Sequence, residues 1–146
     1  MGLRPRVFEV RPGVGIGPVR LGMTPAEVRR AVGRCKVTAG DGGGEWVDAL
    51  GLKVDYAAGA VAFAEAFAVA RARVTLIGRD VFATPADDLV AAVVRHEGLP
   101  VADFPPGRHE YLFPPLRLVL FRGVAPDEPG CVFDSVSVHT PGYYET

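Results

Sequence analysis

The chain has 146 residues, of which 49% are hydrophobic and 23% are charged, and this composition excludes an intrinsically disordered protein. Its 16 Lys and Arg residues against 17 Asp and Glu residues give a net charge of −1. Strong nucleic-acid binding needs a positive excess, so we expect no nucleic-acid partner.

The length suits one globular domain spanning residues 1–146. The N-terminal residues lack the apolar run of a secretory signal, and charged residues at 71, 73, 79 and 80 interrupt the longest apolar stretch. We therefore expect a cytoplasmic protein without a membrane partner. Cys35 and Cys131 are the only cysteines, and the sequence leaves open whether they are paired or free.

The first half begins with a predicted strand over 6–10, followed by an extended, glycine-rich segment over 14–22. Thr24, Pro25 and Glu27 then form the pattern of a capping box with proline at the first helical position. The pattern predicts a short helix over 25–32, which ends at Gly33.

A hairpin is predicted after the loop 39–44. Residues 52–56 alternate apolar and polar side chains, and residues 61–67 place Val61, Phe63, Glu65 and Phe67 in alternation with alanines. Ala58 and Gly59 stand between the two strands as a turn.

In the second half, an apolar run over 74–77 precedes a second Thr-Pro-Ala-acid sequence at 84–87, which predicts a longer helix ending near His96. A loop over 100–109 and strands over 116–121 and 132–139 complete the chain.

The two Thr-Pro-Ala-acid sequences begin at Thr24 and Thr84, and each stands before a helix and paired strands. We interpret this as a tandem duplication of a strand–helix–strand–strand unit, with halves over 6–70 and 71–140. Similar helix starts on their own are the alternative, since Thr, Pro and Glu each favour those positions. The expected fold is α+β: an antiparallel sheet of six to eight strands with two helices on one face.

The run from Gly15 to Val28, with Leu-Gly-Met-Thr and Glu-Val at its core and Gly33 after it, resembles a motif of small bacterial proteins. It is similar to the helix start of β-lactamase-inhibitor-protein-like domains and of outer-membrane-assembly lipoproteins. That resemblance implies a non-enzymatic protein-binding domain with helices on an antiparallel sheet, and in the inhibitor proteins a tandem repeat. It carries over no binding residues.

The motifs of catalysis and of cofactor binding do not occur in the sequence. The glycines at 13–17 lack the Lys and Ser/Thr of a phosphate-binding loop, and the spacing of a dinucleotide fingerprint fails at Pro18. No Gly-x-Ser-x-Gly sequence is present. Convergence of His109, His139 and Cys131 in space would be needed for a metal site. We expect no enzyme activity, no metal and no cofactor.

Aromatic residues in or beside loops and at the C-terminus are the candidate binding residues, because Tyr and Trp combine large apolar area with a polar tip. The candidate interface consists of Trp46, Tyr56, Phe104, Tyr111, Tyr143 and Tyr144. Packing of these rings against sheet ends and loops is the alternative.

The expected function is non-enzymatic binding of a partner protein by loops and the open sheet face, for example to neutralise a toxin or regulate an enzyme. The alternative is a small-molecule-binding protein or minor enzyme with a pocket between helices and sheet, because the alanines over 57–66 could leave room above the sheet. A third hypothesis is a homodimer formed through an uncovered sheet face.

Overall fold

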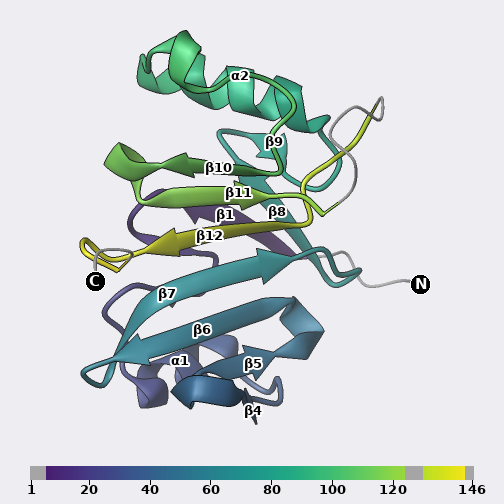
Figure 1. The fold of residues 1–146 in the computed structure, drawn as a ribbon. Helices are drawn as coiled ribbons and strands as arrows, with labels where there is room; N and C mark the ends of the chain where they lie inside the picture. Colours follow the sequence, from purple (N-terminus) through teal and green to yellow (C-terminus); the bar gives the residue numbers. More distant parts are fainter. Residues whose placement is uncertain (1–5, 124–129, 144–146) are drawn as a thin grey trace.

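A seven-stranded antiparallel sheet, in the order β10-β11-β12-β7-β6-β5-β4, forms one layer of the computed structural model, which describes residues 6–123 and 130–143 (Figure 1). Its strands are β4 (Thr38–Ala39), β5 (Glu45–Val47), β6 (Leu52–Ala57), β7 (Ala60–Phe67), β10 (Glu110–Phe113), β11 (Leu118–Phe121) and β12 (Ser135–His139).

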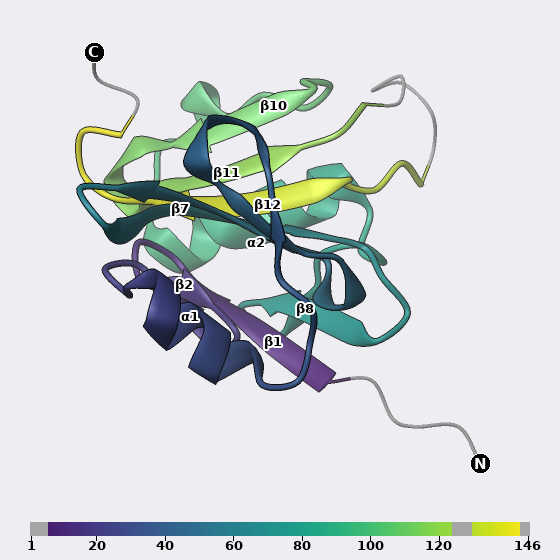
Figure 2. The same ribbon diagram turned by 90° about the horizontal axis from the view of Figure 1, so that it is seen from below.

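The second layer contains a five-stranded sheet in the order β3-β2-β1-β8-β9, in which only the β1–β8 pair is parallel among the described residues. Its strands are β1 (Arg6–Arg11), β2 (Gly15–Ile16), β3 (Val19–Arg20), β8 (Ala72–Leu76) and β9 (Arg79–Asp80). Figure 2 shows β1, β2 and helix α1 (Pro25–Val32) under one face of the large sheet, and Figure 1 shows helix α2 (Ala86–Glu97) beyond β10.

Short 3₁₀ helices complete the chain: η1 (Asp41–Gly43), η2 (Asp48–Leu50), η3 (Val101–Asp103) and η4 (Pro114–Leu116). A tight turn joins β6 to β7, where Ala58 and Gly59 both have positive φ angles of 52° and 79°. Two successive positive φ angles match the twist of a two-residue hairpin, so the predicted hairpin and its turn are confirmed.

The hydrophobic core lies between the two layers and draws on both halves of the chain. Because side chains alternate along a strand, Leu52, Val54, Ala64 and Ala66 point from the large sheet into the core. They meet a set of apolar side chains from β1, β2, β8 and both helices: Phe8, Val10, Ile16, Val28, Val74, Leu76 and Leu89.

Helix α1 forms as its sequence predicts. The Glu27 amide donates to Thr24 Oγ1 at 3.2 Å, and the Thr24 amide donates to Glu27 Oε1 at 3.1 Å, which completes the capping box. This exchange satisfies two backbone donors that the helix itself leaves unpaired.

Helix α2 begins differently, although its sequence is similar. Its N-cap is Pro85, whose side chain has no hydrogen-bond acceptor, and the Ala86 amide donates instead to the backbone oxygen of Cys131 at 2.8 Å. Asp87, which occupies the position of Glu27, accepts hydrogen bonds from Arg122 and Gly107. The two Thr-Pro-Ala-acid sequences thus start helices by different contacts.

The predicted α+β class and the large antiparallel sheet are confirmed, whereas the second sheet was not predicted. The tandem duplication stays a prediction. One similarity between the two halves is the connection β5–β6 in the first and β10–β11 in the second: each is a single 3₁₀ turn followed by a left-handed residue, Gly51 (φ 66°) or Arg117 (φ 50°).

Replacing Thr24 by Ala is expected to lower the free energy of unfolding by about 1 kcal/mol, the usual cost of losing a helix cap. The matched change Thr84→Ala should cost less than half as much, because Pro85 rather than Thr84 is the N-cap of α2. Urea denaturation of both variants measures the difference, and equal losses would contradict it.

Candidate functional site

One face of the seven-stranded sheet is turned away from the second layer, and we call it the outer face. Figure 1 shows it toward the viewer, with the large sheet in front of β1 and β8. The strand registers place fourteen side chains on this face: Thr38, Trp46, Lys53, Asp55, Phe63, Glu65, Phe67, Glu110, Leu112, Val119, Phe121, Ser135, Ser137 and His139.

An aromatic pair lies on the outer face at the β5 side. Trp46 stacks on Phe67 with ring centroids 5.7 Å apart, and Lys53 Nζ lies 5.4 Å from the centroid of the Trp46 ring. Such a cation–π contact orients the lysine without neutralising it. This part of the face therefore combines apolar area with a positive charge.

A second aromatic pair forms where the chain returns after β12. Tyr143 stacks on Phe63 with centroids 5.2 Å apart, and its hydroxyl donates to Asp55 Oδ2 at 3.3 Å. Tyr143 therefore packs back onto β6 and β7.

Polar side chains occupy the middle of the outer face. Ser135 and Ser137 are only 3% exposed; in the β12–β7 register Ser137 lies directly opposite Glu65, and Ser135 lies opposite Phe67. Desolvation raises the pKa of Glu65 above its ordinary value, and a hydrogen bond from Ser135 and the charge of Lys53 oppose this shift.

The β10–β11 side of the outer face carries two exposed apolar side chains. Leu112 is 43% exposed and Phe121 is 41% exposed, with Val119 directly opposite Leu112 in the register. Among the described residues, Leu112 and Phe121 belong to a short set of large apolar side chains that remain this exposed, whereas Val119 is buried. The exposed Glu110 lies directly opposite Phe121 and borders this apolar area with a negative charge.

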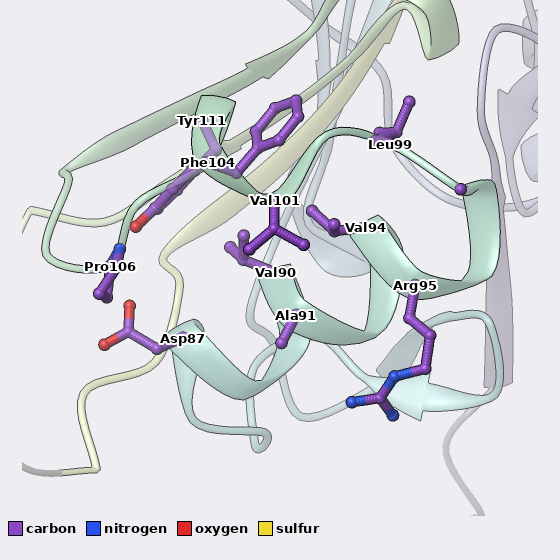
Figure 3. Close-up of a pocket in the computed structure, with 11 residues that line it drawn as sticks. Asp87, Val90, Ala91, Val94, Arg95, Leu99, Val101, Phe104, Pro106 and Tyr111 are labelled. Atoms are coloured by element: carbon purple, nitrogen blue, oxygen red, sulfur yellow. The ribbon is translucent and has the colours of Figure 1, made fainter.

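A cavity of about 600 Å³ lies on the other side of β10, between α2 and the segment 98–106 (Figure 3). Val90, Ala91 and Val94 of α2 form one wall, and Phe104 and Tyr111 contribute to the opposite wall. Its size and apolar lining are those of pockets that bind small molecules.

Polar contacts fix the wall of the cavity at Tyr111. Its hydroxyl donates to the backbone oxygen of Pro105 at 2.7 Å and accepts from the amide of Arg108 at 3.3 Å. Phe104 stacks on the buried Phe113 with centroids 4.7 Å apart. The tyrosine thus presents its ring rather than an unpaired hydroxyl.

The predicted site residues fall into three separate places. Trp46 and Tyr143 lie on or against the outer face, and Phe104 and Tyr111 line the cavity. Tyr56 lies apart, and Tyr144 is outside the described residues. These aromatic residues therefore do not form one continuous interface.

Tyr56 serves the packing of α1 against the sheet. Its hydroxyl donates to Glu45 at 2.6 Å, and Glu45 also accepts from Arg29 of α1. Desolvation, aided by the hydrogen bond to Glu45, raises the pKa of Tyr56. The contact joins β5, β6 and α1.

Sequence reasoning missed Phe63, Phe67, Leu112 and Phe121 as outer-face residues. The sequence pattern indicates two of them: Phe63 and Phe67 lie two residues before and after Glu65 on the same strand, so they share its face of the sheet. Glu65 is half-buried on the outer face. The alanines over 57–66 do not line the cavity; Ala62, Ala64 and Ala66 are buried.

The residues considered for metal or thiol chemistry lie in different places. His109 Nδ1 is 3.0 Å from the backbone oxygen of Arg122, His139 pairs with Phe63 across the sheet, and Cys35 and Cys131 are free thiols. Within the described ranges, no three His, Cys, Asp or Glu side chains gather closely enough to hold a metal ion. In the same part of the chain, neither helix could cross a membrane.

Comparisons of the chain with protein-family models, with curated protein sequences and with solved structures each return no match. The resemblance of the segment 15–28 to β-lactamase-inhibitor-protein-like domains and assembly lipoproteins therefore stays a prediction.

Replacing Glu65 by Gln is expected to stabilise the protein at pH 7. The raised pKa means that the folded state holds the Glu65 proton more tightly than the unfolded state does. As the pH rises from 4.5, the pKa of Glu65 in the unfolded state, through its higher pKa in the folded state, the folded protein loses stability. Gln does not ionise, so the Glu65→Gln variant avoids this loss.

Thermal unfolding of both proteins between pH 3.5 and pH 8 measures this effect. The gain from Glu65→Gln should shrink toward the acidic end, where the native carboxyl is protonated. A gain that is largest at pH 3.5 would contradict the expectation.

Proposed function

We propose that the protein is a non-enzymatic, cytoplasmic protein-binding module that binds its partner through the outer face of the seven-stranded sheet. The observation that carries this proposal is the pair of exposed apolar side chains Leu112 and Phe121, on the same face as two aromatic pairs across β12. Exposed apolar patches with a polar surround are typical of protein interaction sites.

The dimensions of the outer face support this function. Seven strands at a spacing of about 4.8 Å make the sheet about 29 Å wide. A standard protein interface covers about 800 Å² on each partner, which is a square of about 28 Å. One partner domain could therefore cover the face from edge to edge.

The distribution of residue types also supports it. Binding energy concentrates in aromatic and other large side chains, and polar groups fix the orientation of a partner. The outer face offers Trp46, Phe67 and Phe121 as anchors around Glu65 and Lys53. A partner enzyme or toxin would lose access to its own substrate when this face covers its active site.

The double substitution Leu112→Asp and Phe121→Asp is expected to weaken partner binding at least thirtyfold, because it charges the apolar side that a partner must desolvate. Val7→Asp is the matched control, since Val7 is 63% exposed but lies on β1 in the other layer. Affinity capture from lysate of the source organism, followed by titration of the retained protein, measures both effects.

The proposal fails if the partner binds the double variant as tightly as the wild type. It also fails if nothing is captured and the purified protein turns over a small molecule. Sedimentation at several concentrations covers the homodimer: a dimer abolished by Phe121→Asp would make a second copy the occupant of the face.

Small-molecule binding is a second candidate function, and the cavity of about 600 Å³ beside α2 is the observation that favours it. A ligand bound only by the folded protein raises the melting temperature by mass action, so a ligand screen by thermal shift tests this candidate.

A further inference from the structure

The cavity beside α2 opens to solvent on one side, and its lining is mainly apolar. Its apolar lining comes from α2, from the segment after α2 and from β10: Val90, Ala91, Val94, Leu99, Val101 and Phe104 are among these residues. Among the lining residues, charged groups occur at two positions, Asp87 and Arg95. A ligand would therefore be mostly apolar.

The two charged residues mark opposite ends of the cavity. Asp87 and Arg95 are eight positions apart on α2, which corresponds to a rise of about 12 Å along the helix. Figure 3 shows the Asp87 carboxylate beyond one end of the row formed by Val90, Ala91 and Val94 and the exposed Arg95 side chain beyond the other, with its guanidinium extending away from Val101 and Phe104. The cavity thus has an acidic end and a basic end.

The acidic end is already compensated. Asp87 Oδ1 accepts from Arg122 Nη2 at 3.2 Å and from the Gly107 amide at 3.4 Å. Arg122 is 1% exposed, and its Nε donates to the backbone oxygen of Arg108 at 2.7 Å. A second cation from a ligand would compete with this buried guanidinium for the same carboxylate.

The basic end is exposed to solvent, so water, and no protein group within the described residues, solvates the Arg95 charge. Over residues 6–123 and 130–143, Arg95 forms no salt bridge, and the neighbouring His96 and Glu97 pair with each other. A guanidinium binds a carboxylate through two parallel N–H···O bonds, which suits a single carboxylate at this end.

We propose that the cavity binds an amphipathic monocarboxylate, with an apolar chain along Val90, Ala91 and Val94 and its carboxylate at Arg95. A straight-chain fatty acid of medium length has this chemistry. The inference rests on the second candidate function, small-molecule binding, and is independent of partner binding by the outer face.

Calorimetric titration with hexanoate, octanoate and decanoate tests the apolar part. Each added methylene should tighten binding about fourfold while the chain still fits, because each buries more apolar surface. Decanol has the same chain without the charge and should bind at least tenfold more weakly than decanoate.

Arg95→Gln tests the charged part. It should weaken decanoate binding about tenfold and leave decanol binding unchanged. Arg79→Gln is the matched control, because it removes one positive charge from an exposed position on β9, outside the cavity. Ala91→Trp, at an exposed position of the lining, should obstruct the cavity and abolish binding of both ligands.

Phe121→Asp should leave decanoate binding unchanged, and loss of binding in that variant would place the ligand on the outer face and overturn the proposal. If decanoate and decanol bind equally and Arg95→Gln changes neither, the monocarboxylate inference fails while small-molecule binding stands. If no chain length binds, the monocarboxylate inference fails, and the ligand screen by thermal shift decides separately on small-molecule binding. If decanoate binds and Ala91→Trp has no effect, the ligand lies outside the cavity and the proposal is overturned.

Discussion

The antiparallel pairing of β7 with β12 is the interaction on which the rest of the structure depends. It joins a strand that ends at Phe67 to one that begins at Ser135, and so makes one seven-stranded sheet from two distant parts of the chain. The same register sends Ala64, Ala66, Val136 and Val138 into the core and sets Glu65 beside Ser137 on the outer face. A slip of one residue would exchange the two faces.

Small side chains on β7 allow the two layers to approach closely. Ala64 and Ala66 are buried beneath the second layer, in which β2 contacts both β7 and β12. Backbone bonds hold the layers together as well: the Val61 amide donates to the Met23 oxygen, and the Gly22 amide donates to the Val61 oxygen, both at 2.8 Å. The alanines that suggested a pocket in the sequence therefore lie in the packed core between the two layers.

Local signals predicted the elements that depend on neighbouring residues, such as the helix at Pro25–Val32 and the β6–β7 hairpin. The second sheet was missed because three of its strands have two residues, too few for alternation, and because β1 pairs with β8 some 66 positions away. For the site, alternation with Glu65 could have placed Phe63 and Phe67. The cavity could not be foreseen, because it depends on how the segment after α2 folds back over that helix.

The two ends of the large sheet determine how another chain can approach it. β4 has only two residues, and β10 has four, with Pro105 and Pro106 a few residues before it and Pro114 and Pro115 directly after it. Both edge strands are short, and prolines flank β10, so an incoming strand finds few backbone donors and acceptors at either edge, which disfavours the edge-to-edge growth that leads to aggregation. Association is thereby directed to side chains, whose chemistry discriminates between partners, rather than to the backbone, which does not.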